Sequence, residues 1–65
     1  MKLYEGARRG VLHGDMQGDP GMAEVLRALS EWEALTGRDV AYITHGLSPV
    51  SGRVWVAVRP IKTGK

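Results

Sequence analysis

Glycine recurs at every fourth position near the start of the 65-residue chain, at residues 6, 10, 14 and 18, and again at residue 21. Each glycine inside a helix costs about 1 kcal/mol relative to alanine, and Pro20 adds a break of its own. The spacers carry Arg8, Arg9 and Asp15, which exclude the close-packing glycine stripe of a membrane helix. A phosphate-binding loop is disfavoured too, because Asp15 and Asp19 would lie beside the anion. We therefore expect the first third of the chain to turn repeatedly.

Residues 1–13 have two arrangements that fit this pattern. In one, residues 2–7 and 11–13 form a hairpin with its tip at residues 8–10, and Gly10 takes a positive φ in the turn. In the other, a single bent strand runs over residues 3–13 with bulges at Gly6 and Gly10. The sequence does not separate the two. In either case residues 14–19 are expected to be a loop of glycine and aspartate.

Residues 20–36 predict a helix. Asp19 is a good N-cap, and Pro20 suits the first helical position, where its missing N–H is not needed. Gly37 suits a left-handed C-cap at the other end. Between these caps the apolar side chains recur at i, i+3, i+4, i+7 and i+10, which is typical of one buried helical stripe. The stripe consists of Met22, Val25, Leu26, Leu29 and Trp32.

After Gly37 the pattern changes to the period of two that is typical of strands. Residues 39–45 and 53–59 are rich in β-branched and aromatic side chains, and the turn formers of residues 46–52 connect them as a hairpin. Pro60 is expected to end the last strand, which leaves residues 60–65 as a basic tail. The chain thus predicts a single α+β domain over residues 1–65 in the order β(β)αββ. A small antiparallel sheet of three or four strands would carry one α-helix on one face.

The last expected strand has two different sides. Val54, Val56 and Val58 alternate on one side, which we assign to the core beneath the helix. The other side consists of Arg53, Trp55, Ala57 and Arg59. One helix covers only one face of a sheet, so Trp55 would lie on an uncovered face. The neighbouring strand would add either Ala41 and Ile43 or Val40 and Tyr42 to that face, depending on a register that the sequence does not fix.

Composition and motifs argue against several classes of function. The chain has no cysteine, and His13 and His45 are not spaced as metal ligands, so we expect no disulfide, no bound metal and no cofactor. The common motifs of nucleophilic, metalloprotease and nucleotide-binding sites are absent, and no catalytic residue is predicted. No apolar run approaches the ~20 residues that span a bilayer, and no signal sequence opens the chain. We therefore expect a cytoplasmic protein without a membrane partner.

Two functions remain after these exclusions. Small domains are usually stabilised by disulfides, a bound metal or oligomerisation. Because we expect neither a disulfide nor a metal in this chain of 65 residues, the sequence favours a homo-oligomer. The first prediction is a non-catalytic interaction module that binds itself or another protein through a face around Trp55. That interface would consist of Trp55, Arg53 and Arg59, with Ile43 or Tyr42. The net charge of +2 also permits a nucleic-acid-binding protein that uses Arg53, Trp55 and Arg59, helped by Arg8 and Arg9.

Overall fold

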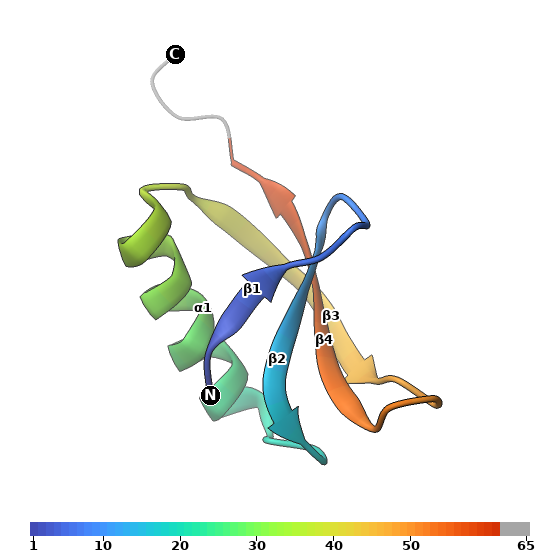
Figure 1. Ribbon diagram of the computed structural model, residues 1–65. Coiled ribbons are helices and arrows are strands. Elements are labelled where there is room, and N and C mark those ends of the chain that lie inside the picture. The colour runs from blue at the N-terminus through green and yellow to red at the C-terminus, as the bar shows by residue number, and fades with distance from the viewer. Residues whose placement is uncertain (62–65) are drawn as a thin grey trace.

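The computed structural model describes residues 1–61, which form one helix and four strands (Figure 1). The elements are β1 (Leu3–Glu5), β2 (Val11–Gln17), α1 (Met22–Thr36), β3 (Val40–Leu47) and β4 (Arg53–Pro60). All strand pairs are antiparallel, and the spatial order of the sheet is β1-β2-β4-β3. Figure 1 shows α1 against one side of the sheet, and the side opposite α1 is called the open face below. The predicted α+β class and element order are confirmed.

The N-terminal segment is a hairpin and not a single bent strand. β1 pairs with β2 from Leu3 opposite Gly14 to Glu5 opposite Leu12. Gly10 has φ +82° in the connection, as predicted, and its carbonyl accepts the N–H of Val58 at 2.8 Å. The expected loop over residues 14–19 is wrong for its first part, because β2 continues to Gln17. Gly14 serves packing there, since a Cβ at this position would overlap the side chain of Val54.

The helix begins two residues later than predicted. Its N-cap is Gly21, with φ +86° and no side-chain cap, so Asp19 is not the N-cap and Pro20 lies outside the helix. Asp19 instead accepts the N–H of Gly21 through Oδ1 at 3.0 Å. A positive φ at Gly21 turns the chain into the helix in a way that glycine tolerates and other residues do not. The left-handed C-cap at Gly37 is confirmed, with φ +72°.

The core lies between α1 and the inner side of the sheet. Its buried side chains are Leu3, Leu12, Val25, Ala28, Leu29, Trp32, Val54, Val56 and Val58. The predicted valine side of β4 and the burial of Trp32 are thus confirmed. Met22 and Leu26 were expected in the buried stripe but stay 49% and 44% exposed. They lie on one flank of the helix, about 60–100° around the axis from the buried Val25.

The C-terminal hairpin is longer than predicted. β3 runs two residues further, to Leu47, and β4 includes Pro60, which lies opposite Val40. Pro60 has no N–H to donate, and the next residue, Ile61, donates to the carbonyl of Asp39 at 3.1 Å instead. Val40, opposite Pro60, donates its own N–H to Glu33 Oε2 at 2.8 Å. A bulge between Tyr42 and Thr44 shifts the register of β3. Residues 62–65 of the expected basic tail lie outside the described residues.

No helix in the described part of the chain is long and apolar enough to cross a membrane.

Candidate functional site

Three ring-bearing side chains form a row across the open face. Tyr4 on β1 lies opposite His13 on β2, and His13 lies opposite Trp55 on β4. Residues directly opposite each other on antiparallel strands point to the same side of the sheet. Trp55 follows the buried Val54 and precedes the buried Val56, which places its side chain on the open face. Tyr4, His13 and Trp55 are called the ring row below.

The indole of Trp55 lies over the backbone of Gly46 on the neighbouring strand. A Cβ on Gly46 would be 2.7 Å from Trp55 Cζ2, 3.1 Å from Cε2 and 3.4 Å from Cη2. All three atoms belong to the six-membered ring of the indole, so this part of the side chain is the one next to Gly46. The indole thus fills the space of the side chain that Gly46 lacks. This contact holds the ring against the sheet and leaves the residue only partly exposed.

Near the other edge of the sheet, the ring of His13 likewise occupies the space above a glycine. A Cβ on Gly6 would be 2.5 Å from His13 Cδ2 and 2.6 Å from Nε2, so the imidazole leans over a second glycine. The Tyr4 and His13 rings have centroids 6.0 Å apart and planes inclined by 34°. Tyr4 is 45% exposed. Gly46 on the edge strand β3 and Gly6 directly after the edge strand β1 thus each make room for a ring from a central strand.

A polar hollow of about 440 Å³ adjoins the ring row. Its lining residues are Tyr4, His13, Gln17, Ser48, Ser51 and Arg53. Gln17 donates from Nε2 to the carbonyl of Ser51 at 3.1 Å, which ties β2 to the β3–β4 loop beside the hollow. The guanidinium of Arg53 and the serine hydroxyls are hydrogen-bond donors suited to phosphate oxygens.

The two arginines of the open face lie near opposite ends of β4. Arg53 is opposite Gln17, Arg59 is opposite Ala41, and both are exposed. Neither has a carboxylate within ion-pair distance in residues 1–61. Five of the seven acidic side chains are engaged with other groups: Glu5 with Arg38, Asp15 with the N–H of Lys2, Asp19 with Gly21, Glu24 with the N-terminal amine and Glu33 with Val40. Within residues 1–61, no carboxylate therefore pairs with Arg53 or Arg59.

Two predicted site residues lie elsewhere. Tyr42 is opposite the buried Val58, so it belongs to the helix side of the sheet and not beside Trp55. Ile43 lies in the bulge and is 53% exposed. The strand neighbour of Trp55 on β3 is Gly46, which sequence reasoning placed in a loop. A glycine directly opposite a tryptophan in the same hairpin is the signal that was missed.

Tyr42, His45 and Asp19 form a row of polar side-chain contacts that the sequence did not predict. The hydroxyl of Tyr42 is 2.8 Å from Nδ1 of His45, and Nε2 of His45 is 3.6 Å from Oδ1 of Asp19. Both nitrogens of the imidazole thus face a polar neighbour. These contacts connect β3 to the segment before α1. Within residues 1–61, no group of three or more histidine, aspartate and glutamate side chains is arranged to hold a metal ion.

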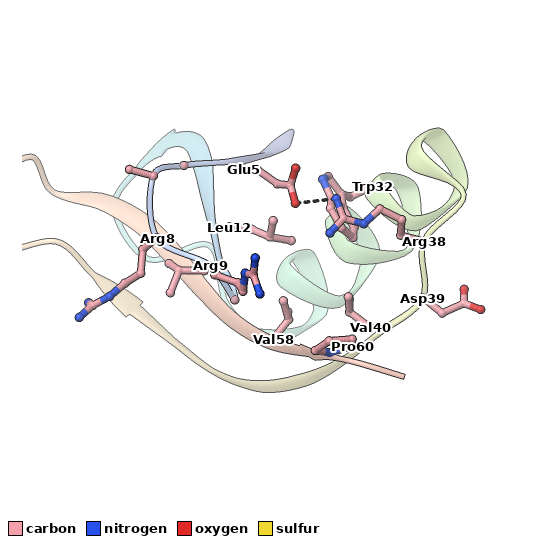
Figure 2. Close-up of a pocket in the computed structure, with 14 residues that line it drawn as sticks. Glu5, Arg8, Arg9, Leu12, Trp32, Arg38, Asp39, Val40, Val58 and Pro60 are labelled. Carbon is pink, nitrogen blue, oxygen red and sulfur yellow. Dashed lines mark hydrogen bonds and ion pairs between the residues drawn. The ribbon is translucent and has the colours of Figure 1, made fainter. Parts of the chain in front are cut away.

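Arg8 and Arg9 lie at a second cavity, away from the ring row. The cavity has a volume of about 530 Å³ and lies between the β1–β2 connection, the C-terminal end of α1 and the outer ends of β3 and β4 (Figure 2). It is called the hairpin cavity below. Figure 2 shows the side chain of Arg9 directed toward the cavity and that of Arg8 directed away from it. The structure therefore does not bring these two arginines together with Arg53 and Arg59 at one site.

Comparison of the chain with protein-family models, with curated proteins and with solved structures finds no match.

Proposed function

We propose that the open face binds single-stranded nucleic acid, with bases stacked on the ring row and phosphates bound by Arg53 and Arg59. The observation that carries the proposal is the position of Trp55, whose indole is held over Gly46 on the face opposite the helix. A ring already fixed in place loses little conformational freedom when a planar ligand stacks on it. Base–aromatic stacking contributes about 1–3 kcal/mol per base in single-strand binding proteins.

The position of the charges supports a polyanion as the ligand. Arg53 and Arg59 flank the ring row along β4 and have no acidic partner within residues 1–61. The phosphates of a nucleic-acid strand that lies along β4 would supply negative charge at both arginines. The polar hollow next to Tyr4 and His13 adds hydroxyl and amide donors at one end of this path. Rings in the middle and cations at the ends are the pattern of a stacking platform.

Self-association through the open face is the other function that the sequence predicts, and we place it second. Part of its support was an apolar partner for Trp55, either Ile43 or Tyr42, whereas the neighbour of Trp55 on β3 is Gly46. A dimer closed through this face would also bring the unpaired arginines of two copies into one interface. Two like charges 4 Å apart repel by about 1 kcal/mol in water and by more where water is excluded.

Binding of a fluorescein-labelled oligothymidylate, followed by fluorescence anisotropy at increasing salt, tests the proposal. Two arginine–phosphate contacts predict a slope of log K against log salt of about −1.4, from roughly −0.7 per phosphate on a single strand. Arg53→Gln and Arg59→Gln should each reduce the steepness of this slope by about 0.7. Arg27→Gln, on the exposed side of α1, is the matched control and should leave the slope unchanged.

Replacement of the ring tests the stacking part of the proposal. Trp55→Leu should weaken binding by about 1–3 kcal/mol while leaving the salt slope unchanged, because it removes a stacking surface and no charge. Thermal unfolding of the same variant establishes that it is folded at the assay temperature. Absence of binding at low salt would refute the proposal. If sedimentation equilibrium then showed a dimer that Trp55→Leu dissociates, the open face would be a self-association surface instead.

A further inference from the structure

We propose that the hairpin cavity binds a small aromatic carboxylate, at a site separate from the open face. The cavity has a volume of about 530 Å³, which lies within the roughly 300–1,000 Å³ of typical small-molecule sites. It lies on the helix side of the sheet and shares no lining residue with the polar hollow of the open face. A ligand can therefore occupy it without touching the ring row.

The apolar part of the cavity suits the ring of such a ligand. Leu12, Trp32 and Val58 each have less than 8% of their surface exposed, and they line the cavity together with Val40. Figure 2 shows Leu12 and Val58 on either side of the Arg9 guanidinium, with Val40 and Trp32 beside them. These side chains belong to the core or pack against it, so the apolar wall is formed before a ligand arrives. A preformed wall lowers the cost of ordering on binding.

The charges around the cavity suit one carboxylate. Arg38 donates from Nη1 to Glu5 Oε2 at 2.6 Å, and its guanidinium carbon lies 5.4 Å from the ring centroid of Trp32. The charge of Arg38 is thus balanced by Glu5, and its position over Trp32 is fixed. Arg9 also lines the cavity and has no carboxylate within ion-pair distance in residues 1–61. Asp39 also lines the cavity, but its carboxylate is directed away from Arg9 in Figure 2.

The guanidinium of Arg9, which has no carboxylate partner within residues 1–61, therefore selects the ligand. Guanidinium binds a carboxylate with two parallel hydrogen bonds, which gives both strength and orientation. An aromatic carboxylate places its charged group at Arg9 while its ring reaches the wall formed by Leu12 and Val58. A neutral ligand of the same shape would leave Arg9 without a partner, and a cationic one would be repelled.

The probe is 2-naphthoate, with the neutral amide 2-naphthamide as its control, titrated into ¹⁵N-labelled protein and followed by NMR. The protein has two tryptophans on opposite sides of the sheet, so their indole N–H signals act as internal reporters. The proposal predicts that 2-naphthoate shifts the signal of Trp32 and leaves that of Trp55 in place. It also predicts that 2-naphthamide binds about tenfold more weakly, because it lacks the charge-assisted hydrogen bonds to Arg9.

Arg9→Gln and Arg8→Gln form a matched pair, since both remove one positive charge from neighbouring positions. Arg9→Gln should weaken 2-naphthoate binding about tenfold, whereas Arg8→Gln should change it less than about twofold. Equal weakening by the two variants would overturn the proposal, because it would reveal general attraction to the basic hairpin. The comparison of acid and amide on the unmodified protein decides the matter even if Arg9→Gln disturbs folding. Equal affinity for acid and amide, or a shift of Trp55 in place of Trp32, would also overturn it.

Discussion

Gly46→Ala tests the contact between the indole of Trp55 and β3. The new Cβ would lie 2.7 Å from Trp55 Cζ2, so the ring must move away from the strand. Overpacking of this kind typically costs about 1–3 kcal/mol, while replacing a strand glycine by alanine gains about 0.5–1 kcal/mol. Gly46 does not have a positive φ, so no backbone strain adds to the effect. The ring lies at the surface and can yield, and we expect a net destabilisation of about 1 kcal/mol.

Thermal unfolding monitored by circular dichroism measures this change. A loss of about 1 kcal/mol lowers the melting temperature of a domain of this size by about 4–8 °C. The control is the same substitution in a Trp55→Val background, where no ring occupies the space above Gly46. There Gly46→Ala should stabilise the protein by about 0.5 kcal/mol, which gives a coupling of about 1.5 kcal/mol between the two sites. A higher melting temperature for Gly46→Ala in the unmodified protein would refute the described contact.

Other stability predictions follow from single contacts, each measured as a change in the urea unfolding midpoint. Gly10→Ala should cost more than 1 kcal/mol, because φ is +82° and the new Cβ would lie 3.2 Å from the carbonyl oxygen of Val58. Glu33→Ala should cost about 1 kcal/mol by removing the acceptor for the N–H of Val40, and an unchanged midpoint would show that water replaces it. Asp19→Ala should cost only a few tenths of a kcal/mol, because the carboxylate is exposed and caps no helical N–H; a loss of 1 kcal/mol or more would mean that it caps the helix after all.

The parts of the fold that depend on local pattern could be predicted from the sequence. The C-cap at Gly37 follows from the ability of glycine to adopt the left-handed conformation, and alternation alone assigns Val54, Val56 and Val58 to the core. The start of the helix could not be predicted in the same way. Asp19-Pro20 resembles a helix start, but the positive φ of Gly21 delays the helix to Met22.

The composition of the open face depends on contacts between segments that are distant in sequence. The bulge after Tyr42 reverses which residues of β3 point to this face, so Ala41 lies on it before the bulge and Thr44 and Gly46 lie on it afterwards. Simple alternation over residues 39–45 therefore assigns only part of the strand correctly. Gly14 and Gly46 resemble loop residues in the sequence, whereas in the structure each makes room for a side chain of β4. Which glycine bends the chain and which one accommodates a neighbour is decided by tertiary packing.

The most direct test of the proposed function is an NMR titration of the ¹⁵N-labelled protein with an unlabelled oligothymidylate of about eight nucleotides at low salt. The two indole N–H signals report on opposite sides of the sheet, since Trp55 lies on the open face and Trp32 is buried under α1. Stacking of bases on the ring row predicts that the Trp55 signal shifts progressively and that the Trp32 signal does not. If the oligonucleotide moves neither signal, or moves Trp32 and spares Trp55, the open face does not bind single-stranded nucleic acid.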